Sequence, residues 1–266
     1  MIDTHCHLTF PQYEGRVAGV LADARAAGVT GAVTVSTTTR DCLAALDLAR
    51  AHDRLWCTAG VHPLYADGGR DGLPHVWDNL RLVASDPACV AWGELGLDNH
   101  YDRPPRDLQR AVLGEQLDRI GAWMESDGLD LPVVLHCREA FSDLIPILRD
   151  GPVAPERHVF HCFTGTPEDA RAVLDFGAWI SFTGVVTFAN ASAVRDAARL
   201  VPADRLMVET DAPFLTPEPH RKVRPNEPKF VADTARFLAE LRGEDWDSFH
   251  AQINDNTRRF FGIDAQ

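Results

Sequence analysis

Short runs rich in apolar and β-branched residues recur along the chain. They alternate with longer stretches whose apolar residues follow helical spacing, such as Val17–Ala24, Cys42–Ala49 and Leu108–Ile120. Eight runs have the length and composition of strands, and they are Met1–His7, Thr30–Thr37, Leu55–His62, Cys89–Leu95, Leu131–Arg138, Arg157–Phe163, Ala178–Thr183 and Arg205–Asp211. Strands that alternate with helices predict βαβ units and a parallel sheet.

Eight such units close naturally into a (β/α)8 TIM barrel, and 266 residues are typical of one barrel. We therefore predict an α/β fold with a single barrel domain over residues 1–266. Two further helical segments, near Lys229–Leu241 and Trp246–Phe261, are expected to pack outside the barrel. A doubly wound open sheet is the alternative, but it would be favoured by a Gly-rich turn after the first run, which the sequence lacks.

Composition and charge limit the classes of protein to which this chain can belong. Hydrophobic residues make up 45% of the chain and charged residues 24%, which suits one large core. No apolar run approaches the ~20 residues of a membrane helix. With no export signal at Met1 and six cysteines that form no Cys-x-x-Cys pair, we expect a reduced cytoplasmic protein with no membrane partner. The net charge of −13 argues against a protein that coats nucleic acid by bulk electrostatics.

The candidate chemistry lies where the apolar runs end. Six polar side chains finish five of the runs: His5, His7, Glu94, His136, His161 and Asp211. Because the carboxyl ends of barrel strands form one rim, we expect these side chains to converge there. His5 and His7 are two apart in a strand, so their rings share a face.

Four imidazoles and two carboxylates exceed the three protein ligands of a catalytic zinc site, and they fit two divalent ions about 3.5–4 Å apart. We predict that Glu94 bridges the ions, that His5, His7 and Asp211 complete one, and that His136 and His161 complete the other. A carbamylated lysine bridge is excluded, because the two lysines, Lys222 and Lys229, lie outside the strands. Magnesium, manganese and zinc all suit such ligands.

The charge of this centre points to its substrate. Two divalent cations and two carboxylates leave about +2, which favours a phosphodiester over a neutral amide. We name Asp211 and Glu94 as catalytic residues, with Asp211 orienting the attacking water or taking its proton.

The neighbours of the six ligands have simpler interpretations. Cys6, Cys137 and Cys162 each follow a ligand histidine and should face the helices as buried small hydrophobes rather than bind metal. Asp3 and Glu209 lie two residues before His5 and Asp211, and each could hold a ligand imidazole or form an internal salt bridge.

Candidate substrate contacts are basic. The loop after the last strand carries His220, Arg221 and Arg224, near the place where barrels often bind phosphate. Arg138 could clamp a phosphate, and His62 could touch substrate or brace its loop.

The motifs resemble those of the TatD family of metal-dependent deoxyribonucleases, within the amidohydrolase-like barrel superfamily. The resemblance rests on Asp3–Leu8, Gly60–Pro63, Gly93–Asp98, His136–Ala140, His161–Gly165 and Glu209–Pro213, and it extends to the Asn226-Glu227-Pro228 loop. It implies the same six metal ligands and metal-dependent cleavage of DNA, often from a 3′ end, with single-stranded ends as the substrate. Pro225 stands where the family commonly has Arg, so either Arg221 or Arg224 could face the phosphate.

Two other functions stay open on the sequence. One is a two-metal hydrolase of another ester or amide, such as an aminoacyl-tRNA ester or a small metabolite. The other is a non-catalytic barrel with structural metal, which the open ligand positions of the second ion count against. The sequence does not call for an oligomer, and a monomer is compatible with it.

Overall fold

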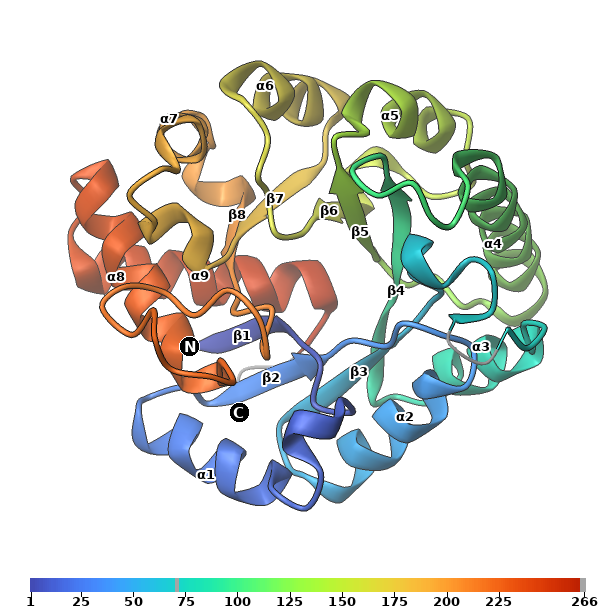
Figure 1. Ribbon diagram of the computed structural model, residues 1–266, viewed down its shortest axis with the longest axis horizontal. Coiled ribbons are helices and arrows are strands. Elements are labelled where there is room, and N and C mark those ends of the chain that lie inside the picture. The colour runs from blue at the N-terminus through green and yellow to red at the C-terminus, as the bar shows by residue number, and fades with distance from the viewer. Residues whose placement is uncertain (70–71, 264–266) are drawn as a thin grey trace.

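A closed ring of parallel strands forms the centre of the molecule (Figure 1). The computed structural model describes residues 1–69 and 72–263. The strands follow one another around the sheet in chain order, and they are β1 (Ile2–Cys6), β2 (Gly31–Thr34), β3 (Leu55–Ala59), β4 (Cys89–Asp98), β5 (Val133–Arg138), β6 (His158–Phe160), β7 (Trp179–Phe182) and β8 (Leu206–Val208). A parallel bridge between Cys6 and Ala212 joins the two ends of the sheet. The predicted (β/α)8 barrel is confirmed, and the open doubly wound sheet is wrong.

Helices surround the barrel, as the spacing of apolar residues predicted. They are α1 (Val17–Ala26), α2 (Asp41–Ala51), α3 (Trp77–Ala84), α4 (Arg106–Asp127), α5 (Phe141–Arg149), α6 (Pro167–Phe176), α7 (Ser192–Leu200), α8 (Val231–Arg242) and α9 (Trp246–Phe261). The start of α6 follows from its sequence, because Thr166 and Asp169 form a capping box and Pro167 occupies the first turn. Within the described residues, no helix has the length and apolar character needed to cross a bilayer.

The last helix covers one end of the barrel. In Figure 1, α9 passes behind the strands. Phe260 and Phe261, at its C-terminal end, pack with the first residues of several strands, among them Ile2, Val90 and Met207. Because these residues begin their strands, the aromatic pair covers the N-terminal end of the barrel. The polar strand ends are left at the opposite mouth.

Two details of the strands decide where the polar side chains lie. Along β4, the pairing with β5 shifts register between Trp92 and Leu95. Gly96 has φ +145, and a Cβ atom there would run into the carbonyl oxygen of His136, so this close approach of β4 to β5 requires glycine. β6 and β8 end sooner than predicted, at Phe160 and Val208, which places their polar residues on the loops just beyond.

His158 gives the fold a testable pH dependence. Its ring is buried at the start of β6, and burial lowers the pKa of His158 to about 4. An unfolded chain binds the proton nearer pH 6.5, so this part of the stability is present above that pH and is lost as the pH falls towards 4. The loss amounts to roughly 3 kcal/mol in the free energy of unfolding.

We expect His158→Gln to flatten the stability profile between pH 6.5 and 4, measured by urea denaturation at a series of pH values. His52→Gln, at a partly exposed position, is the matched control and should keep the wild-type profile. An unchanged slope in His158→Gln would contradict the assignment.

Candidate metal centre and its pocket

A buried carboxylate stands at the middle of the C-terminal mouth of the barrel. Glu94, on β4, is only 1% exposed, and histidines from β1, β5 and the loops after β3 and β6 surround it. Its Oε1 atom lies 2.7 Å from Nε2 of His161, 2.9 Å from Nδ1 of His136 and 3.4 Å from Nε2 of His62. This oxygen therefore faces the side of the barrel formed by β3, β5 and β6.

The other oxygen of Glu94 faces the opposite side. Oε2 lies 3.4 Å from Nε2 of His5 and 3.8 Å from Nε2 of His7. These two imidazole nitrogens are 3.3 Å apart, and Oδ1 of Asp211 lies 3.3 Å from that of His7 and 3.8 Å from that of His5. The structure thus brings together all six side chains that the sequence singled out, in two groups on either side of one carboxylate.

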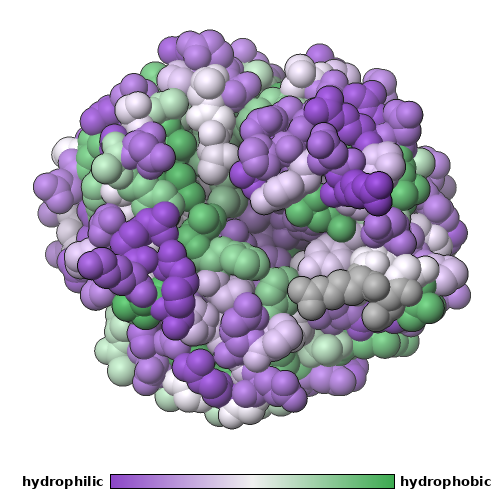
Figure 2. Space-filling view, in the orientation of Figure 1, coloured by the Kyte–Doolittle hydropathy of each residue, from purple (hydrophilic) through white to green (hydrophobic). Residues whose placement is uncertain are grey.

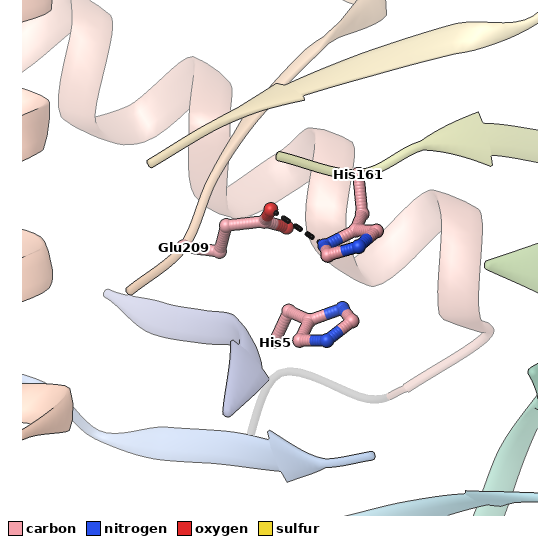
Figure 3. A group of neighbouring side chains, drawn as sticks. All are labelled: His5, His161 and Glu209. Carbon is pink, nitrogen blue, oxygen red and sulfur yellow. Dashed lines mark hydrogen bonds and ion pairs between the residues drawn. The ribbon is translucent and has the colours of Figure 1, made fainter. Parts of the chain in front are cut away.

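The outward nitrogens of two rings are held by further acids. Oδ2 of Asp98 lies 3.0 Å from Nε2 of His136, and Oε1 of Glu209 lies 3.2 Å from Nδ1 of His161 (Figure 3). A neutral imidazole has one N–H and one lone pair, so a proton shared with the outer carboxylate leaves the lone pair on the inner nitrogen. This arrangement of carboxylate and histidine is typical of metal-binding imidazoles.

His7 continues the pattern, whereas Nδ1 of His5 is buried and has no hydrogen-bond partner among the described residues. Nδ1 of His7 lies 3.0 Å from the carbonyl oxygen of Val35, which fixes its lone pair on the inner Nε2 atom. The ring of His5 stacks on that of His161, with centroids 3.9 Å apart (Figure 3). The imidazole and carboxylate atoms that face the centre therefore form a donor set that fits divalent transition metals.

His62 differs from the other histidines in its tautomer. Its Nδ1 accepts a hydrogen bond of 3.0 Å from the backbone N–H of Leu64, so the neutral ring carries its proton on Nε2. Burial lowers the pKa of His62 to about 3, which keeps the ring neutral. His62 therefore presents an N–H to the centre, where His7, His136 and His161 present lone pairs.

Glu94 stays ionised in spite of its burial. Burial works to raise the pKa of Glu94, but the surrounding imidazoles, with His161 the strongest, hold it well below its usual range. For Asp211, burial also works to raise the pKa, but the contacts with His7, His5 and His161 together hold it below its usual range. Both acids are thus available as anionic ligands.

The strand pattern predicted that Asp3 and Glu209 could each hold a ligand imidazole, and the structure bears this out for only one of them. Glu209 makes the predicted contact with an imidazole, but Asp3 does not: it accepts hydrogen bonds from the backbone and hydroxyl of Thr210. The register of β1 shifts between Asp3 and Cys6, so the two-residue alternation cannot be extended back from His5. Thr4 contacts Glu209 instead, at 3.3 Å.

Asp98 is the supporting residue that the sequence interpretation missed. It lies four residues after Glu94 on the same strand, and strand alternation could have placed both on the inner face.

The three cysteines do not join the centre, and no cysteine belongs to a candidate metal-binding group within residues 1–69 and 72–263. Cys6 and Cys137 are buried in apolar clusters, as expected. Cys137 also lines the pocket, as does Cys162, which follows the end of β6 and is only partly buried. The Sγ atom of Cys162 lies 3.6 Å from Oγ1 of Thr183. Burial raises the pKa of the Cys162 thiol well above its ordinary value, so it is not a thiolate.

A pocket of about 950 Å³ opens above the centre, and Figure 2 shows the molecule hollowed near the middle of this face. Arg138 and His62 line it, as do Tyr101 and Phe214.

The basic loop is not part of the pocket lining. Arg224 donates to Thr216 and to carbonyls of its own loop, Arg221 lies over the ring of Phe188, and His220 packs on Phe230. These three predicted contacts are therefore engaged with the loop and its neighbours, whereas Arg138 is placed to meet a ligand.

Known proteins share this architecture over the whole chain. Residues 2–262 match the family described as TatD related DNase. The chain is 40% identical to the uncharacterized metal-dependent hydrolase YcfH of Escherichia coli K12 over 268 residues, covering 100% of this chain and 97% of that protein. It is 36% identical to the 3′-5′ ssDNA/RNA exonuclease TatD of Pantoea ananatis, covering 99% of this chain and 100% of that protein.

A solved structure agrees with these sequence matches. The crystal structure of the TatD homolog YJJV from Escherichia coli K12 superposes with a TM-score of 0.89 at 31% identity. The superposition covers 99% of this chain and 98% of that chain.

The contact between Asp98 and His136 yields a test of the supporting acids. Asp98→Asn keeps the shape of the side chain but removes the charge that holds Nε2 of His136. We expect the affinity for Mn²⁺ to fall about 10- to 100-fold, measured by isothermal titration calorimetry. Asp102→Asn, at an exposed position nearby, should bind Mn²⁺ as the wild type does. Equal affinities in the two variants would show that Asp98 does not support the centre.

Proposed function

Since the chain belongs to the family of TatD-related DNases, we propose that it is a nuclease that hydrolyses phosphodiester bonds of DNA. It is a metal-dependent hydrolase of the TatD type. The proposal adds the substrate, the number of ions and the roles of the residues.

The observation that carries the proposal is the position of Glu94. Its two oxygens face two separate groups of imidazoles, which is the arrangement that a bridge between two cations needs.

We assign the two groups to two ions. His5, His7 and Asp211 would hold one ion with Oε2 of Glu94, and His136 and His161 would hold the other with Oε1. Magnesium, manganese or zinc would suit these ligands. When bound, such a pair of ions lowers the pKa of water and neutralises charge on a phosphate.

The protein's own side chains then divide the remaining work. Asp211 lines the pocket and would orient the attacking water and accept its proton. His62 and Arg138 also line the pocket, and the Nε2–H of His62 and the guanidinium of Arg138 would donate to phosphate oxygens. These donors suit a phosphodiester better than a neutral amide, because a neutral amide brings no anionic oxygens to receive them.

The direction of cleavage is part of the same proposal. The relative from Pantoea ananatis is named a 3′-5′ ssDNA/RNA exonuclease and matches this chain from end to end. We therefore propose that single-stranded DNA is cut from its 3′ end.

The activity can be tested with oligothymidylate labelled at its 5′ end, in the presence of Mg²⁺ or Mn²⁺. Removal of nucleotides from the 3′ end would produce a ladder of successively shorter labelled products. We expect Glu94→Gln to reduce the rate by roughly 10³-fold or more, because the bridging charge is lost. Glu125→Gln, on the exposed side of α4, is the control. An intact oligonucleotide with every metal, or equal rates for Glu94→Gln and wild type, would rule out the proposal.

The two-ion assignment has its own test, in which bound metal is counted by mass spectrometry after gel filtration. Glu94→Ala should weaken both positions, because it removes a ligand from each. His136→Ala or His161→Ala should remove mainly one of two ions. Circular dichroism would confirm that each variant is folded. Equal metal content in all three variants and the wild type would refute a bridging Glu94.

A further inference from the structure

Two aromatic side chains are unusually exposed. Within the described part of the chain, Phe214 and Tyr101 are the aromatic residues among the exposed large hydrophobics, at 48% and 47% exposure. Both line the pocket above the metal centre. An apolar ring left open to solvent at a pocket is a contact surface for a flat ligand.

The two rings come from opposite sides of the barrel. Tyr101 follows β4 and Phe214 follows β8, and these strands are four positions apart in a ring of eight. Figure 1 shows β4 and β8 across the barrel from each other. The metal centre, with Glu94 from β4 and Asp211 from the end of β8, lies between them.

Phe214 is held firmly beside the centre. Its backbone N–H donates to the carbonyl oxygen of Asp211 at 2.9 Å, and the side-chain amide of Asn226 donates to its carbonyl oxygen. The ring meets that of Phe10 edge to face, with centroids 6.1 Å apart, and lies 6.5 Å from the ring of His7. A base resting on Phe214 would therefore adjoin the ligands of one proposed ion.

Tyr101 is held on the other side. Its backbone N–H donates to Oδ1 of Asp98, the acid that also contacts His136. The guanidinium carbon of Arg138 lies 5.1 Å from the centroid of the tyrosine ring. A base on Tyr101 would therefore adjoin the ligands of the second proposed ion and the cation that faces the pocket.

We propose that Phe214 and Tyr101 each stack on one of the two nucleobases that flank the scissile phosphodiester. The inference rests on the proposed nuclease function and adds the residues that select its substrate. Stacking needs bases whose faces are free, so the two rings favour a single strand over a duplex, and they tolerate any base. It also suits a protein of net charge −13, whose overall field repels a polyanion.

The test combines protein variants that lack one aromatic ring with DNA substrates that lack one base. Oligothymidylate is prepared intact, with an abasic 3′-terminal nucleotide, or with an abasic penultimate nucleotide. Phe214→Leu and Tyr101→Leu should each lower kcat/KM on intact substrate by roughly 5- to 100-fold. For each variant, the loss should disappear on the abasic substrate that lacks the base on which the removed ring stacks. The two variants should therefore differ in which abasic substrate shows no loss. Phe214→Trp should restore the rate, because it restores a ring.

The controls separate stacking from a role in folding. Leu82→Ala, on α3 at a residue 61% exposed, should leave the rates unchanged. A loss in Phe214→Leu that persists on both abasic substrates would overturn stacking and leave the nuclease function standing. Stacking would also be overturned, with the nuclease function left standing, if the wild type cleaves intact DNA and both leucine variants cleave it at the same rate. A wild type that leaves intact DNA uncut with Mg²⁺ and with Mn²⁺ overturns the nuclease function and the stacking together.

Discussion

The buried charge of Glu94 is the constraint on which the site depends. An ionised carboxylate with 1% exposure is costly unless cations or hydrogen-bond donors surround it. Imidazoles from β1, β5 and the loops after β3 and β6 lie within 3.8 Å of its two oxygens, where protons on the rings or bound cations would supply the positive charge. The outer acids Asp98 and Glu209 then orient two of those rings. At the mouth of the barrel, the central acid Glu94 is therefore surrounded by imidazoles, and two of these imidazoles contact a further acid on their outer side.

The protein carries a net charge of −13, and its proposed substrate is a polyanion, so the composition of the pocket matters. The pocket of about 950 Å³ gathers histidines, Arg138 and two exposed rings, together with the carboxylates of Glu94, Asp98, Glu139, Asp169 and Asp211. Phe260 and Phe261 cover the other end of the barrel. A polymer therefore meets the centre from one side, where the proposed divalent ions, Arg138 and the two rings would offset the negative charge of the chain.

Much of this arrangement could be predicted from the sequence, because a barrel forces the ends of its strands onto one rim. The alternation of strands and helices predicted the fold, and the polar ends of five runs predicted Glu94 and the five residues around it. The strand pattern could not predict local departures from regular strand geometry. A register shift in β1 turned Asp3 towards Thr210, and the early end of β6 left Cys162 in the pocket. The basic loop satisfies much of its own charge, as with Arg224, through bonds that no spacing rule reveals.

The seam between β1 and β8 has a consequence for the protein without its ions. The sheet closes there through the single bridge of Cys6 and Ala212, with backbone bonds from Asp211 to His5 and from His7 to Ala212 beside it. His5 and His7 stand on one side of this seam and Asp211 on the other. A cation held by all three would tie the two sides of this joint together and so stabilise the closed barrel.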